Sequence, residues 1–148
     1  NTSVKCIDFD RLFDGVYTKT SALVAAEYVE SSTTLQTLDL CVVCHEGFHE
    51  IREMISLVLC SLSRNQSVTK LIIYPGVVSF ASVAVQEFLT CTQTLQKLQL
   101  IAFGNEAFDE RQTAAIASGF ANNTTLRDLE LESWKEANLV PVLAALQG

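Results

Sequence analysis

The residues best suited to metal chemistry lie in one short segment, Cys41-x-x-Cys44-His45-Glu46-x-x-His49. His45-Glu46-x-x-His49 has the spacing of zinc proteases, in which two histidines four residues apart on a helix bind Zn²⁺ and the glutamate polarises a water molecule. A catalytic zinc also needs a third protein ligand, for which Glu50 and Glu53 are close in sequence. One hypothesis is therefore a zinc-dependent hydrolase.

Two other uses of this segment are open. Zn²⁺ could be held without catalysis by four ligands: Cys41, Cys44, His45 and His49. Cys41-x-x-Cys44-His45 also matches the attachment signature of c-type haem. Gly47 weakens a helix where the protease motif requires one, and the chain has no further histidine. We therefore favour a solvated loop, and expect neither a metal nor a cofactor.

The elements that position this segment follow from an apolar signature that occurs five times. Its copies begin at residues 4, 35, 68, 95 and 126, so successive starts are separated by 31, 33, 27 and 31 positions. They read Val4-x-x-Ile7-x-Phe9, Leu35-x-x-Leu38-x-Leu40, Val68-x-x-Leu71-x-Ile73, Leu95-x-x-Leu98-x-Leu100 and Leu126-x-x-Leu129-x-Leu131. The alternation predicts half-buried strands whose intervening residues point outward. A period of this length is typical of stacked strand-plus-helix units.

A segment with helical spacing precedes each later strand. Six residues before the strand signature stand Val29, Leu62, Leu89 and Phe120, and about one helical turn further upstream stand Ala25, Val58, Val85 and Ala117. These two sets are predicted to share a buried helix face. Short polar joints follow, such as Arg64-Asn-Gln-Ser67 and Asn122-Asn-Thr-Thr125, and their residues favour helix ends and turns.

The succession of helix, Asn-x-Thr-Leu-like turn and Leu-x-x-Leu-x-Leu resembles the ribonuclease-inhibitor-like class of leucine-rich repeats. The resemblance covers essentially the whole chain. It implies a curved, right-handed α/β solenoid of about five repeats, with parallel strands on the concave face and helices on the convex face. We expect a single domain over residues 1–148 that is a fragment of a longer protein. The chain opens almost directly on a strand and stops just after a helix-like segment, whereas solenoids usually end in polar capping units.

One departure from that class concerns the loop after each strand, where the class usually places Asn or Cys. This chain has Leu12, Val43, Gly76, Phe103 and Trp134 at those positions. A ladder of polar side chains is therefore expected to be replaced by apolar packing, with Phe103 and Trp134 directed to the core.

Composition restricts the partners. A net charge of -7 disfavours nucleic acid and anionic membranes, because phosphate binding requires clustered Lys and Arg, and it favours basic protein surfaces. Five scattered cysteines indicate free thiols and a cytoplasmic location, and Cys60 and Cys91 are interpreted as small hydrophobic residues beside the core. Four glycosylation-type sequons, at Asn1, Asn65, Asn122 and Asn123, mostly coincide with the polar joints.

Function is expected on the outward strand positions. The third and fourth strands carry an apolar and basic centre between acidic outer strands, which is a composition suited to protein binding. The candidate partner-binding residues are Lys70, Ile72, Tyr74, Lys97, Gln99 and Ile101. Isolated Ile and Tyr could instead serve β-propensity alone. We expect a protein-interaction module that is not an enzyme. Exposed terminal repeats offer a second route of association, between two copies of the chain.

Overall fold

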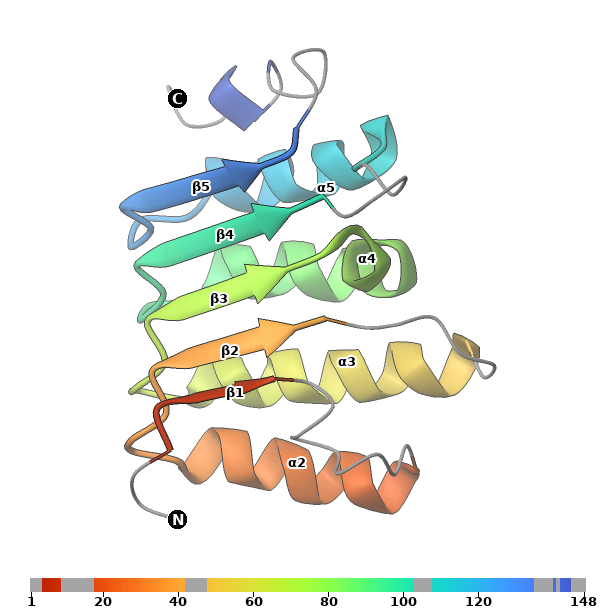
Figure 1. Ribbon diagram of the computed structural model, residues 1–148, viewed down its shortest axis with the longest axis vertical. Coiled ribbons are helices and arrows are strands. Elements are labelled where there is room, and N and C mark those ends of the chain that lie inside the picture. Colours follow the sequence, from red (N-terminus) through yellow and green to blue (C-terminus); the bar gives the residue numbers. More distant parts are fainter. Residues whose placement is uncertain are drawn as a thin grey trace.

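Strands and helices alternate through the part of the chain that the computed structural model describes, namely residues 4–8, 18–41, 48–102, 108–134, 140 and 142–144. Their order is β1 (Cys6–Asp8), α2 (Lys19–Ser31), β2 (Thr37–Leu40), α3 (Phe48–Arg64), β3 (Lys70–Ile73), α4 (Pro75–Cys91), β4 (Lys97–Ile101), α5 (Glu110–Ala121) and β5 (Asp128–Glu132). The strands form one parallel sheet in the order β1-β2-β3-β4-β5. All four labelled helices lie behind that sheet, and the crossovers are right-handed (Figure 1).

The strand signature builds the core as predicted. In the second, third and fourth units all three signature residues are at most 1% exposed: Leu35, Leu38, Leu40, Val68, Leu71, Ile73, Leu95, Leu98 and Leu100. The matching residues of the last unit, Leu126, Leu129 and Leu131, are only partly buried. The α/β solenoid expected from the sequence is therefore confirmed, with its apolar row less covered at the C-terminal unit.

The helices stack on one another behind the sheet, α2 against α3, α3 against α4 and α4 against α5. Val29, Leu62, Leu89 and Phe120 are all buried, as predicted. The second helical set needs one correction, because Ile116 takes the fully buried position in α5 and Ala117 is only half-buried. Packed helices need roughly 8–10 Å between axes, whereas paired strands need about 4.8 Å. This difference places the strands on the inner side of the curve.

Each polar joint is closed by a side chain three residues before the strand signature. The side-chain oxygens of Ser32, Asn65, Thr92 and Asn123 accept from the backbone N–H of Leu35, Val68, Leu95 and Leu126, at 3.1, 2.7, 3.4 and 2.7 Å. Such local bonds satisfy backbone N–H groups in the turn that leads from each helix into the following strand. The prediction that these residues form turns is confirmed.

A second polar position ties neighbouring units together. The hydroxyls of Thr34, Ser67, Thr94 and Thr125 donate to carbonyls of the preceding unit, those of Val4, Leu35, Asn65 and Thr92, at 3.2, 2.7, 3.3 and 3.4 Å. A polar ladder therefore runs along the solenoid at the joints before the strands.

The structure of the joints shows which of these glycosylation-type sequons are accessible. Asn65 is fully buried, and its Nδ2 donates to the carbonyls of Val29 and Ser32 at 2.6 and 2.8 Å. A glycan cannot reach that nitrogen in the folded protein. Asn122 is exposed, so its sequon is accessible.

No helix in the described ranges has the length and apolar character needed to cross a membrane.

Candidate functional site

The outward strand positions form one continuous surface, here called the sheet face. Strand register aligns them in rows: Cys6, Thr37, Lys70, Lys97 and Asp128 in one row, and Asp8, Asp39, Ile72, Gln99 and Glu130 in the next. Ile101 pairs with Glu132 in a third row, which Tyr74 and Cys41 extend beyond the ends of their strands. Among the candidate binding residues, Lys70 therefore lies beside Lys97, and Ile72 lies beside Gln99.

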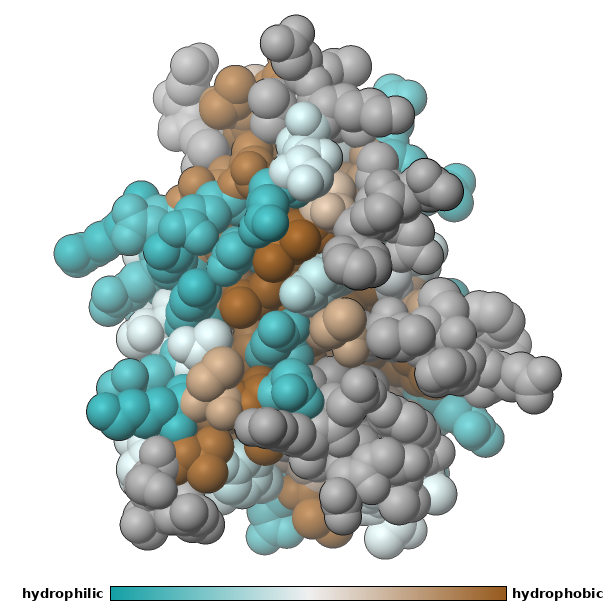
Figure 2. All heavy atoms as spheres, in the orientation of Figure 1, coloured by the Kyte–Doolittle hydropathy of each residue, from teal (hydrophilic) through white to brown (hydrophobic). Residues whose placement is uncertain are grey.

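The centre of the sheet face is apolar but only half-exposed. Ile72, Tyr74 and Ile101 are each intermediate in burial, while the residues between them on β3 and β4 point into the core. Figure 2, which looks onto this face, shows brown hydrophobic atoms between teal hydrophilic ones at the centre of the sheet. A partner that covered these three side chains would bury further apolar area, which favours association.

Two polar contacts across β4 and β5 organise one side of this centre. Lys97 Nζ lies 2.6 Å from Glu130 Oε1, and Gln99 Nε2 donates to Glu132 Oε2 at 3.4 Å. The hydrogen bond to Glu130 is the main cause that raises the pKa of Lys97, and the same bond lowers the pKa of Glu130. Both groups are thus held charged at neutral pH, and Lys97 faces an acidic neighbour rather than standing alone.

Asp39 lies on the opposite side of the centre, directly across from Asp8. Its Oδ1 is inaccessible to solvent and accepts no hydrogen bond from any residue in the described ranges. Burial raises the pKa of Asp39, repulsion from Asp8 raises it further, and a backbone hydrogen bond at Cys41 and the charge of Lys70 oppose the rise. Tyr74 also has a raised pKa, caused first by burial and then by the negative charge of Asp39.

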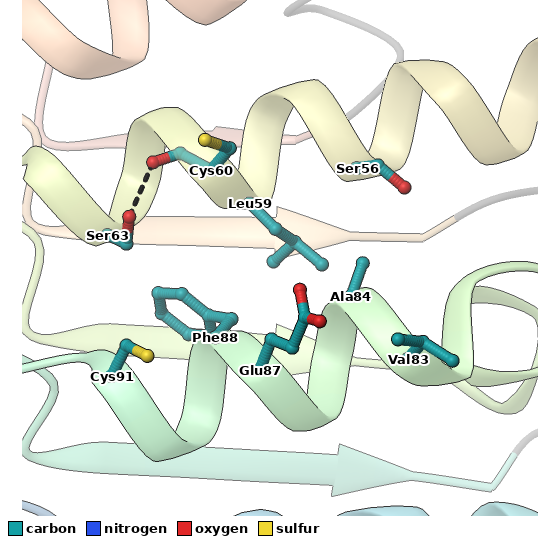
Figure 3. Close-up of a pocket in the computed structure, with 9 residues that line it drawn as sticks. All are labelled: Ser56, Leu59, Cys60, Ser63, Val83, Ala84, Glu87, Phe88 and Cys91. Atoms are coloured by element: carbon teal, nitrogen blue, oxygen red, sulfur yellow. Dashed lines mark hydrogen bonds between the residues drawn. The ribbon is translucent and has the colours of Figure 1, made fainter.

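A groove on the helix face was not predicted from the sequence. It has a volume of about 340 Å³ and lies between α3 and α4, where Leu59, Ala84 and Phe88 line it (Figure 3). Val83 on its rim is 67% exposed, although α4 already buries Val77, Val78, Val85 and Leu89. The sequence signal is that α4 carries more apolar residues than one buried face requires.

Cys60 and Cys91 line the same groove (Figure 3). Both are exposed, so the interpretation of these cysteines as small hydrophobic residues beside the core is wrong. The reason is helical position, since Cys60 follows the buried Leu59 directly and Cys91 comes two residues after the buried Leu89, and both cysteines are turned toward solvent. Cys6, Cys60 and Cys91 have free thiols, as expected.

Of the four proposed zinc ligands only Cys41 has a described side chain, while Cys44 and His45 lie outside the described residues, as does the side chain of His49. Within the described ranges, no three His, Cys, Asp or Glu side chains are grouped so as to hold a metal ion. Glu50 and Glu53, the suggested third ligands, line a separate cavity of about 320 Å³ between α2 and α3 with Lys19 and Met54.

Trp134 packs against the core, as predicted. Its ring stacks on Phe108 with 4.7 Å between centroids, and its Nε1 donates to the carbonyl of Leu100 at 3.2 Å. Apolar packing thus replaces the usual Asn or Cys here, yet the side chain still satisfies a backbone carbonyl of the preceding unit. Phe103, Leu12 and Val43 lie outside the described residues.

Comparison with known proteins supports the architecture. No family model and no curated protein sequence matches the chain. Among solved structures, leiomodin-1 actin-binding site 2 superposes with a TM-score of 0.61 at 15% identity, over 97% of this chain and 79% of that one. The tropomodulin C-terminal domain of Caenorhabditis elegans aligns with a TM-score of 0.41 at 10% identity, over 85% of this chain and 91% of that one.

The chain has a leucine-rich-repeat fold. Three observations show it: the repeated strand signature, the single parallel sheet backed by helices, and the superposition with the leiomodin-1 structure. At 15% identity, the superposition shows a similar backbone fold. The chemistry of the sheet face must be derived from this chain's own residues.

Proposed function

We propose that this chain is a protein-interaction module that binds a partner protein through the sheet face. The observation that carries the proposal is the half-exposed trio Ile72, Tyr74 and Ile101 on two adjacent strands, with the charged residues Lys70 and Lys97 beside it. An apolar anchor inside a polar rim is the usual anatomy of a binding hot spot, since burial supplies free energy and the rim supplies orientation. Lys70, Lys97 and Gln99 belong to that proposed rim.

The charge of the sheet face favours a basic partner. Its described outward strand positions hold the carboxylates of Asp8, Asp39, Asp128, Glu130 and Glu132 against the amines of Lys70 and Lys97. Lys97 is moreover paired with Glu130. Complementary potentials accelerate association and exclude like-charged competitors. The finer assignment, a single cytoplasmic domain of the ribonuclease-inhibitor-like class, is part of the same proposal. The α-helical backing and the repeat length support the class, and the free thiols of Cys6, Cys60 and Cys91 support the cytoplasmic location.

The test compares two matched triple variants, after circular dichroism has shown that both are folded. One changes the sheet face, Ile72→Glu, Tyr74→Glu and Ile101→Glu, and the other changes exposed apolar residues of the helix face, Leu23→Glu, Val24→Glu and Val83→Glu. Each adds three carboxylates, so a difference between them reports position rather than charge. Affinity purification from cell lysate should recover a partner with wild type and the helix-face variant but not with the sheet-face variant.

Actin is the first defined partner to include, because the leiomodin-1 structure is named as an actin-binding site. Co-sedimentation with actin filaments and binding to monomeric actin can be measured with the same three proteins. Recovery of one partner by all three, or its loss only in the helix-face variant, would reject the sheet face as the binding surface. The second outcome would assign binding to the helix side.

A further inference from the structure

β5 (Asp128–Glu132) is an edge of the sheet, since it pairs with β4 on one side and no other described strand lies beyond it. The N–H of Asp128 donates to the carbonyl of Gln96, and the carbonyl of Glu132 accepts from Ala102, both at 3.0 Å. Backbone groups of successive strand residues point to opposite sides. The N–H and C=O groups of Leu129 and Leu131 are therefore directed away from β4, toward the edge.

The apolar side of β5 is less covered than that of any inner strand. Leu129 and Leu131 are only partly buried, whereas Leu98 and Leu100, their partners on β4, are 0% exposed. Val142 is buried at this end of the core, and residues 142–144 lie above β5 in Figure 1. The leucine row nevertheless retains accessible area that an added strand would cover.

The sheet-face side of β5 carries a regular row of charge. Asp128, Glu130 and Glu132 are all exposed and alternate with the two leucines. We propose that the β5 edge binds an extended segment of another protein with Lys or Arg at alternating positions and apolar residues between them. In this mode, main-chain hydrogen bonds supply affinity and alternate side chains supply specificity. The basic residues would face the carboxylates, competing with Lys97 at Glu130 and with Gln99 at Glu132, and the apolar residues would cover Leu129 and Leu131.

A second copy of this chain fits the edge poorly. A symmetric dimer through β5 would pair two antiparallel copies of the same strand. That arrangement places the three carboxylates of one copy opposite those of the other, and like charges directly across a strand pair are destabilising. The acidic row therefore protects the edge against self-pairing while favouring a basic strand.

Synthetic peptides separate strand addition from simple charge attraction. The probe is acetyl-Ser-Lys-Val-Lys-Val-Lys-Ser-amide, and two control peptides have the backbone nitrogens of either the lysines or the valines methylated. Methylation keeps the charge and removes donors, so it abolishes pairing only where those nitrogens face β5. In a parallel arrangement the lysine nitrogens face β5, whereas in an antiparallel arrangement the valine nitrogens do. We expect one methylated peptide to bind at least about tenfold more weakly than the probe at equal ionic strength.

The protein-side variant is Leu131→Pro, which removes an N–H directed to the edge and leaves the β4 ladder intact. It should weaken binding of the probe peptide by a similar factor, while the far-ultraviolet circular dichroism spectrum of the protein stays unchanged. Equal binding of all three peptides to wild type, or no binding of the probe, would overturn the proposal even if the proline variant fails to fold. A concentration-dependent dimer that the probe does not disperse would assign the edge to a second copy instead. None of these outcomes depends on the trio Ile72, Tyr74 and Ile101.

Discussion

The side-chain amide of Asn65 donates a 2.6 Å hydrogen bond to the carbonyl of Val29, a residue of the preceding unit. The same amide reaches the carbonyl of Ser32, and its oxygen accepts from the backbone N–H groups of Ser67 and Val68 at 2.7 Å each. One fully buried side chain thus closes its own turn and joins two units. Asn123 repeats the arrangement in the last unit, with Leu89 as its carbonyl partner at 2.7 Å.

Replacing Asn65 should therefore destabilise the solenoid more than a surface change. Asn65→Ala removes the side-chain partner of the Val29 carbonyl and of the N–H groups of Ser67 and Val68, while the Ser32 carbonyl keeps the Ser67 hydroxyl, and each unsatisfied buried group is costly. We expect the free energy of unfolding to fall by about 3 kcal/mol. Urea denaturation followed by circular dichroism measures it.

Asn122→Ala is the matched control, because Asn122 is exposed and its Nδ2 makes a single 3.5 Å contact, with the carbonyl of Ser118. A change within about 0.5 kcal/mol is expected there. A loss of unfolding free energy in Asn65→Ala as small as that in Asn122→Ala would show that the joint tolerates the removal of its buried amide. That result would contradict the structural role assigned to Asn65.

α5 packs closely against α4 at Gly119. A Cβ placed on it would lie 2.7 Å from Leu89 Cβ and 3.3 Å from the carbonyl oxygen of Gln86. Gly119→Ala should lower the free energy of unfolding by about 1–2 kcal/mol, because overpacking outweighs the roughly 1 kcal/mol gain in helix propensity. Arg111→Ala, at an exposed position of the same helix, serves as control in the same thermal or urea melts. A stabilised Gly119→Ala would show that the helices can separate at little cost.

The sequence predicted the strands and the buried helix positions because both follow from local periodicity. Leu35, Leu38 and Leu40 alternate as a half-buried strand requires, and Val29 precedes them at helical spacing. The outward rows also followed, since equal signatures in parallel strands fix the register. The architecture was therefore predictable from residue spacing alone.

The remaining features depend on contacts between units that residue spacing does not encode. The exposure of Cys60 and Cys91 is decided by the exact rotation of each helix against its neighbour. The pairing of Lys97 with Glu130 depends on side-chain conformation, and it offsets the charge of one of the two lysines in the predicted apolar and basic centre. The cross-unit bond of Asn65 likewise appears only when the units stack.

Asp39 should make stability depend on pH. Its pKa is raised in the folded protein by burial and by Asp8, so the folded state holds the proton more tightly than the unfolded state does. Stability should therefore decrease as pH rises from the ordinary value of 3.8 through the raised value. Asp39→Asn removes the repulsion from Asp8 and should stabilise the protein at pH 7 by about 0.2–1 kcal/mol. Melting temperatures of both proteins from pH 3 to pH 8 test this, and parallel pH profiles would contradict it.

Arg52 should support the bend in α4. Ala81 interrupts that helix with φ -139° and ψ 46°, and the carbonyl of Phe80 just before it accepts from Nε of Arg52 on α3 at 3.0 Å. Arg52→Ala should lower the free energy of unfolding by about 1 kcal/mol, and hydrogen exchange should quicken at the first amides after the bend. Glu53→Ala, an exposed neighbour on the same helix, controls for the loss of a charged side chain. Unchanged exchange in Arg52→Ala would mean that the bend is held by the packing of Val77, Val78 and Ala81 alone.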